Sequence, residues 1–192
     1  MTTRQLKPAT PRAARRTTQA RTAAKTSAEP ALTHEASHAF GDAQIDRYRL
    51  ANGLTLLLLN DASAPVVSYS TWYRVGSRHE KPGKTGLAHF FEHLMFNETE
   101  HLEAGEFDRK LEESGAESNA ATWFDWTYYY EALPKESLGL AVKLESDRMA
   151  HLVLRKPQVE SEREVVSNER RFRVDDDVEG AANEELYKLA FT

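Results

Sequence analysis

The segment His89–His93 places two imidazole side chains four residues apart, with the carboxylate of Glu92 between them, in the order H-x-x-E-H. If the segment is helical, residues four apart lie on one face with their Cβ atoms about 5–6 Å apart. Both histidines can then bind one zinc ion, since zinc accepts imidazole nitrogens at about 2.0–2.1 Å. Glu92 lies on the same side, where its carboxylate can take a proton from a metal-bound water.

A third metal ligand is expected on another predicted helix, residues 159–172, where Glu162 and Glu169 lie on one stripe seven residues apart. Carboxylates at core-facing positions need a reason, and pairing with Arg residues on neighbouring elements would be sufficient for this pair alone. Catalytic zinc, however, takes three protein ligands and keeps one open position. Beside His89 and His93 we therefore assign Glu169 as the third ligand, and Glu162 as a residue that orients a histidine.

A second two-histidine pattern, His34-Glu35-Ala36-Ser37-His38, has the ordinary H-E-x-x-H order and competes with the first. With Gly41 it matches the start of a longer three-histidine motif, but the last ligand position holds Gln44 instead of His. Its flanks are a basic tail and a predicted strand instead of an amphipathic helix. We interpret this pattern as a solvated loop.

The elements that must position these residues are those of an α+β domain, with an antiparallel or mixed sheet packed against helices. Asn52-Gly53 between apolar runs predicts a hairpin within residues 43–59, and the second run, residues 54–59, resembles a strand buried on both faces. Residues 86–96 predict a helix that is apolar on nearly all sides and hence buried. The remaining expected strands are residues 66–75, 118–122 and 127–133, and the remaining helices are 103–113 with a stop at Gly115, 135–152, 159–172 and 180–189.

Charge separates the chain into two parts. The first 28 residues carry seven basic and no acidic side chains, and subtracting these charges from the net −5 leaves the remainder at −12. We expect a disordered basic tail at residues 1–42 and a domain at residues 43–192. The negative charge of the domain argues against a nucleic-acid partner. The positive charge of the tail, taken alone, would still allow the tail to anchor the protein to nucleic acid or to anionic lipid.

Composition also bears on location. No run approaches the ~18 apolar residues of a membrane span, and the tail lacks the apolar core of a Sec signal peptide. The chain contains no Cys, which excludes disulfides and thiolate-bound metal and fits a reducing compartment. These features favour the cytoplasm, while the basic, acid-free tail also has the composition of a transit peptide, which leaves the mitochondrial matrix open.

Taken together, these residues resemble the pitrilysin/insulinase family of inverted-motif zinc metallopeptidases, which includes the mitochondrial processing peptidase. The resemblance covers roughly residues 43–191. The loop after the metal helix departs from it, because Asn97-Glu98-Thr99 stands where many members carry Gly-Thr. The matching stretches are Val75–Glu80, Gly86–Phe96, Gly115–Ala120 and Glu162–Glu169.

The resemblance implies a zinc metalloendopeptidase that hydrolyses extended, unstructured peptides with one Zn²⁺ per chain. It implies that His89, His93 and Glu169 bind zinc, that Glu92 is the general base and that Glu162 supports the catalytic site. It also implies that Asn119 and Ala120 lie on the edge strand to which the peptide adds.

Family members contain two related halves, in one chain or in two, and this chain resembles a first half that is truncated at its C-terminal end. The expected partners are therefore a peptide substrate and a second homologous half, or a second copy of the chain. The alternative function is a non-catalytic or incomplete half that acts only as a subunit or scaffold beside another half. The complete ligand set favours catalysis.

Overall fold

The structure is a computed structural model that describes residues 31–191. The chain divides into two compact units, and the boundary in the sequence lies between residues 61 and 62. The predicted tail lies mostly outside the described residues, so its disorder over residues 1–30 stays a prediction. No helix of the described chain is long and apolar enough to cross a membrane.

The first unit is a three-stranded antiparallel sheet in the order β1-β2-β3. Its strands are β1 (Leu32–Phe40), β2 (Ala43–Leu50) and β3 (Thr55–Leu59). The hairpin predicted at Asn52-Gly53 is confirmed, because it joins β2 to β3 and Gly53 has a φ of +92°, which favours glycine.

Two predictions about this unit were wrong. Residues 32–40 form strand β1 instead of continuing the tail, and the histidines at 34 and 38 lie in that strand instead of in a loop. Pairing with β2 stabilises the strand, and Glu35 forms ion pairs with Arg47 and Arg49 across the sheet. Strand β3 is exposed instead of buried on both faces, with Leu57 62% exposed, because no helix among the described residues belongs to this unit.

The second unit contains a three-stranded antiparallel sheet in the order β4-β6-β5. Strands β5 (Glu117–Thr122) and β6 (Thr127–Pro134) form the predicted pair, and β4 (Val66–Tyr73) lies on the other side of β6. Strand β5 is an edge strand, because within the described residues it pairs with β6 alone.

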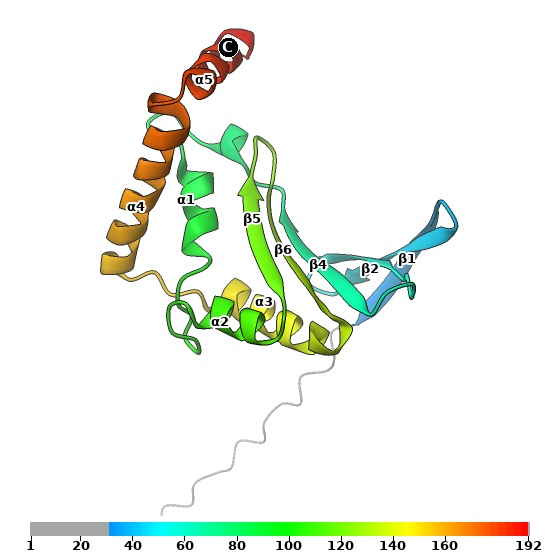
Figure 1. Ribbon diagram of the computed structural model, residues 1–192. Coiled ribbons are helices and arrows are strands. Elements are labelled where there is room, and N and C mark those ends of the chain that lie inside the picture. Colours follow the sequence, from blue (N-terminus) through cyan, green and yellow to red (C-terminus); the bar gives the residue numbers. More distant parts are fainter. Residues whose placement is uncertain (1–30, 192) are drawn as a thin grey trace, which may run out of the picture. The chain divides into compact units, whose positions relative to one another are not determined.

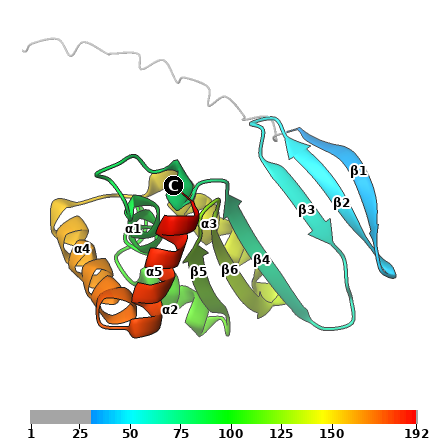
Figure 2. The same ribbon diagram turned by 90° about the horizontal axis from the view of Figure 1, so that it is seen from above.

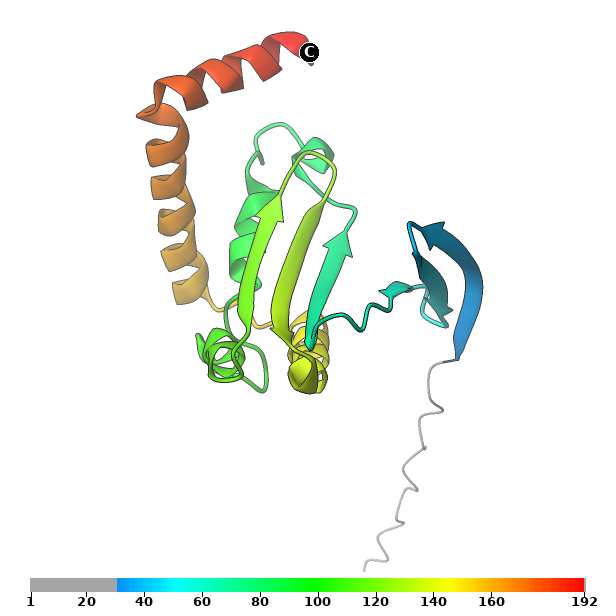
Figure 3. The same ribbon diagram turned by 45° about the vertical axis from the view of Figure 1, so that its right-hand side comes forward.

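Five α-helices within the described residues complete this unit, so the predicted α+β class is confirmed. Helix α1 lies between the sheet and α4, as all three ribbon views show (Figures 1, 2 and 3). A π-helical turn, Arg171–Asp175, joins α4 to α5. The helices are α1 (Leu87–Leu94), α2 (Glu106–Glu113), α3 (Leu138–His151), α4 (Lys156–Arg170) and α5 (Val178–Ala190).

Helix α1 is less buried than its apolar composition predicted. Only Glu92 and Leu94 are buried, while Leu87 and Phe91 are 42% and 43% exposed. The exposed side of the helix lines a pocket instead of packing against a further element. Hydrophobic composition all around a helix therefore did not predict complete burial here.

The core beneath the sheet contains a buried ion cluster as well as apolar side chains. Arg148 of α3 forms ion pairs with Glu131 of β6 and Glu145 of α3, and each of these side chains is at most 2% exposed. The guanidinium carbon of Arg148 also lies 4.3 Å from the ring centre of Tyr129. Thr71 of β4 donates a hydrogen bond of 2.9 Å to Glu145, which ties α3 to the sheet.

Burial favours the protonated form of one of these carboxyl groups, although it lies 3.5 Å from the guanidinium of Arg148. Burial, and after it the neighbouring Glu145, raises the pKa of Glu131 from the ordinary 4.5 to about 9, against the opposing effect of Arg148. The folded protein therefore binds a proton that the unfolded chain releases above about pH 4.5. This contribution to stability is fully present below that pH and is lost as the pH rises through about 9.

We expect the Glu131→Gln variant to lose this pH dependence. Relative to the variant, the unfolding free energy of the wild type should fall as the pH rises from about 5 to about 9, by up to about 1.4 kcal/mol per pH unit. Urea denaturation at a series of pH values measures the difference. The matched control is Glu117→Gln on the exposed side of β5. Wild-type and Glu131→Gln curves that stay parallel across this range would contradict the prediction.

Candidate metal centre

Helix α1 is held in place at its N-terminal end by a carboxylate from the preceding turn. Glu80 accepts hydrogen bonds from the backbone amides of Gly86 (2.8 Å) and Ala88 (2.7 Å). These amides belong to the first turn, where a helix has no internal acceptor for them and where a negative charge is stabilised. Gly86 itself has a φ of +87°, which explains a glycine at this position.

The turn that carries Glu80 is itself anchored to the loop between β5 and β6. The amides of Ser77 and Arg78 donate to the carbonyl oxygens of Trp123 and Phe124. A Cβ atom on Gly76 would lie 2.3 Å from the carbonyl oxygen of Trp123, so only glycine allows this approach. The position of α1 therefore depends on backbone contacts with the sheet as well as on its own packing.

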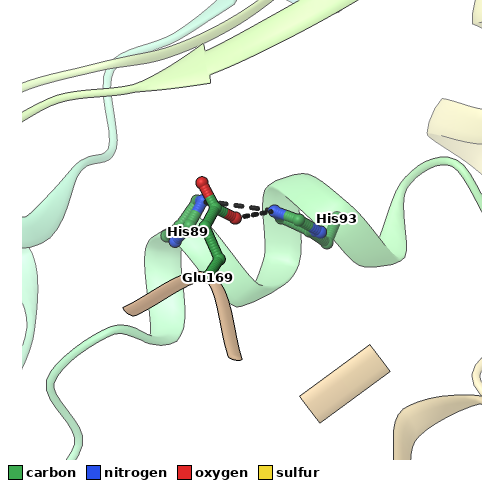
Figure 4. Close-up of side chains that lie close together, drawn as sticks. All are labelled: His89, His93 and Glu169. Atoms are coloured by element: carbon green, nitrogen blue, oxygen red, sulfur yellow. Dashed lines mark hydrogen bonds and ion pairs between the residues drawn. The ribbon is translucent and has the colours of Figure 1, made fainter. Parts of the chain in front are cut away.

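His89 and His93 of α1 meet Glu169 of α4, and the three side chains point toward one another (Figure 4). The Nε2 atoms of the histidines are 3.2 Å apart. The Oε2 atom of Glu169 lies 3.6 Å from His89 Nε2 and 3.3 Å from His93 Nε2. Three donor atoms from two helices thus form a nearly equilateral triangle.

Two further side chains contact the members of this triangle through atoms that are not themselves part of it. Glu162 Oε1 lies 2.9 Å from the Nδ1 atom of His93, which leaves the Nε2 atom directed at the other donors. Arg173, in the π-helical turn, forms an ion pair of 3.0 Å with the Oε1 atom of Glu169. Such outer contacts fix the orientation of metal-binding side chains in known sites.

The triangle fits zinc. Tetrahedral zinc with bonds of about 2.0–2.1 Å separates its ligand atoms by about 3.3–3.4 Å, which lies within the observed range of 3.2–3.6 Å. Two imidazoles and one carboxylate are also a donor set of catalytic zinc sites. The structure therefore brings together the three predicted ligands in an arrangement that can hold this ion.

Glu92 lines a pocket whose lining includes neither of the two histidines. It is 8% exposed, its Oε2 atom has no hydrogen-bond partner among the described residues, and the pocket has a volume of about 490 Å³. Tyr129 of β6 lines the same pocket, and burial raises the pKa of its hydroxyl, which stays neutral. A buried carboxylate oxygen without a hydrogen-bond partner is unfavourable, and the Oε2 atom is therefore available to accept a hydrogen bond in this pocket.

Asn119 and Ala120 lie on the edge strand, as predicted, but they are not part of the metal centre. The side chain of Asn119 accepts a hydrogen bond of 2.8 Å from the amide of Ala120. Strand β5 lies beside α1 (Figure 1), so its unpaired edge is near the helix that carries the histidines.

The sequence alone did not identify two residues that support this site, Glu80 and Arg173. An acidic side chain seven residues before Leu87, the first residue of α1, could have indicated that Glu80 caps the start of this helix. Arg173 follows Glu169 by four residues, which is the spacing of a helical ion pair, but the expected helix gave no reason to single it out.

Comparisons with known proteins agree with this geometry. Residues 55–192 match the model of the insulinase family, peptidase family M16. The zinc protease PqqE of Helicobacter pylori is 36% identical over 143 residues, covering 74% of this chain and 32% of that protein. The mitochondrial-processing peptidase subunit beta of Lentinula edodes is 31% identical over 142 residues, covering 74% and 30%. The crystal structure of a protease from Helicobacter pylori superimposes with a TM-score of 0.71 at 36% identity, covering 72% of this chain and 34% of that one.

The chain spans about a third of the length of the curated relatives that it matches. The family match, residues 55–192, covers the strands of the second unit, α1 and α4, and so includes every residue of the candidate centre. The match of the family model extends over well over half of the sequence, and the chain therefore belongs to the insulinase family of peptidases, family M16.

Proposed function

We propose that this chain is the zinc-binding half of a metalloendopeptidase that hydrolyses extended, unstructured peptides. The observation that carries the proposal is the triangle of His89, His93 and Glu169, with donor atoms 3.2–3.6 Å apart. Relatives named zinc proteases support the same chemistry. One Zn²⁺ ion per chain would be held by these three side chains.

A bound zinc ion supplies a Lewis acid that polarises the substrate carbonyl and acidifies water. Glu92 then acts as the general base, since its buried carboxylate has a free oxygen atom on the adjoining pocket. Its Oε2 atom accepts the proton of the attacking water and afterwards delivers that proton to the leaving amine. Glu162 acts through His93, whose ring it holds in one orientation.

The substrate would add to the free edge of β5 as an extra antiparallel strand. An unpaired strand edge offers backbone N–H donors and C=O acceptors to a peptide. Only a peptide whose own backbone groups are not already hydrogen-bonded can pair with this edge, so the edge selects unfolded segments. Asn119 and Ala120 lie on this edge and would contact the peptide backbone.

A second homologous half, or a second copy of the chain, would complete the substrate-binding chamber. One relative is named as the beta subunit of a mitochondrial-processing peptidase, which supports assembly from more than one part. The alternative, a non-catalytic subunit, requires that the complete set of ligands and the base have no role in hydrolysis. The following variants separate the two functions.

We expect Glu92→Gln to keep zinc and to lose hydrolysis. The amide cannot accept a proton, so cleavage of a quenched, unstructured peptide should fall by at least about 10²-fold. Zinc content, measured by atomic absorption, should match the wild type. The control is Glu164→Gln, exposed on α4. A folded, zinc-loaded wild type that cleaves no peptide, alone or with added second half, would favour the non-catalytic alternative.

We expect Glu169→Ala to lose the zinc ion held by His89 and His93 as well as the activity. It removes one of three protein ligands, and zinc affinity should fall by more than the roughly 100-fold limit seen for outer contacts. Titration of the metal-free protein with zinc by calorimetry measures the loss. Glu164→Ala, on the exposed side of the same helix, is the matched control. Unchanged zinc affinity in Glu169→Ala would exclude Glu169 as a ligand.

Glu162→Ala should have an intermediate effect. His93 keeps its Nε2 atom but loses the partner at Nδ1, so zinc affinity should fall by about 10- to 100-fold without a change in stoichiometry. The same titration, compared with Glu169→Ala, gives the ranking. An affinity equal to the wild type would show that the contact between Glu162 and His93 has no influence on the metal.

A further inference from the structure

A second cluster of metal-binding side chains lies elsewhere in the second unit and shares no residue with the first. Asp147 and His151 are one turn apart at the C-terminal end of α3, and His101 comes from the segment between α1 and α2. The Oδ1 atom of Asp147 lies 2.6 Å from His101 Nδ1 and 3.0 Å from His151 Nδ1. The two imidazole rings are nearly perpendicular, with centres 4.7 Å apart.

The two segments that carry these side chains are fixed to each other by their backbones. Thr99 and Leu152 form an antiparallel bridge. The amide of Glu100 donates to the carbonyl of His151 (2.9 Å), and the amide of Val153 donates to that of Glu98 (3.0 Å). The side chains therefore meet on a preformed backbone framework, so little ordering remains to oppose the binding of a ligand.

The carboxylate of this cluster is oriented as a metal ligand usually is. Its Oδ2 atom accepts a hydrogen bond from the Thr99 hydroxyl, which leaves Oδ1 directed at the two histidines. That hydroxyl in turn accepts from the amides of His101 (3.1 Å) and Leu102 (3.0 Å). Ligating carboxylates in known sites have outer hydrogen bonds of this kind.

We propose that His101, Asp147 and His151 bind a second divalent transition-metal ion. Two imidazoles and a carboxylate suit zinc, cobalt or nickel more than calcium or magnesium, which prefer oxygen ligands. Tetrahedral separation of about 3.3–3.4 Å requires each histidine to move outward by under about 1 Å. Their exposure, 60% for His101 and 41% for His151, allows that movement and gives the ion access.

The bound ion would tie the segment after α1 to the end of α3. Of the three side chains, one lies between α1 and α2 and two lie on α3, so the ion crosslinks parts of the chain 46 residues apart. Because the folded state alone brings them together, metal binding there stabilises the fold. None of its three side chains lines the pocket that contains Glu92, and we assign this site a structural role instead of a catalytic one.

The test is the zinc stoichiometry of the chelator-stripped protein, measured by calorimetry, for the wild type and for His101→Ala. We expect two ions per wild-type chain and one per His101→Ala chain. In the Glu169→Ala background, which lacks the first centre, one ion should remain, and none should bind after His101→Ala is added. Zinc should raise the thermal midpoint of Glu169→Ala but not that of the double variant.

The matched control is His38→Ala, which removes an exposed histidine from β1. It should leave both ions in place, which excludes a general effect of histidine number. His151→Ala is the second variant and should also lose one ion, so the result does not depend on the folding of one substitution. A Glu169→Ala chain that binds no zinc, or a His101→Ala chain that still binds two ions, would overturn the proposal and leave the cluster as a hydrogen-bonded contact only.

Discussion

The packing of α1 against α4 is the constraint on which the candidate site depends. Helix α1 can supply two imidazoles by itself, but the third donor lies 76 residues beyond His93 and reaches it only where α4 runs alongside (Figure 1). Partly buried ionisable groups are unfavourable unless they are paired or bind a metal. The contacts of Glu162 and Arg173 keep the donors directed at one point, and thereby make the helix pair specific as well as stable.

The sheet connects this site to the core. Tyr129 of β6 lines the pocket that contains Glu92, and its ring also lies over the guanidinium of Arg148. The cluster of Arg148, Glu131 and Glu145 therefore packs against Tyr129, a residue that lines the pocket in which proton transfer is proposed. Replacing such a cluster with apolar residues is often tolerated in other proteins, so its value here is the fixed geometry of β6 and α3 more than net stability.

The sequence predicted the parts of the structure that have local signals. The hairpin at Asn52-Gly53, the stop at Gly115 and the helices that carry His89 and Glu169 are all present, because turn chemistry and periodicity are local properties. The errors have a nonlocal cause. Strand β1 depends on pairing with β2, and the exposure of β3 and of Phe91 depends on which elements face them, which no short window of sequence contains.

The two histidine clusters differ in a way that sets their expected order of affinity. In the first, the donors are already 3.2–3.6 Å apart, so zinc can enter with little rearrangement. In the second, the histidines lie at hydrogen-bond distance from Asp147, and a metal must displace those contacts and separate the donors. When the donor atoms are already in place, binding costs less free energy for ordering and moving the side chains. The centre formed by α1 and α4 should therefore fill first, and the cluster at the end of α3 only at higher zinc concentration.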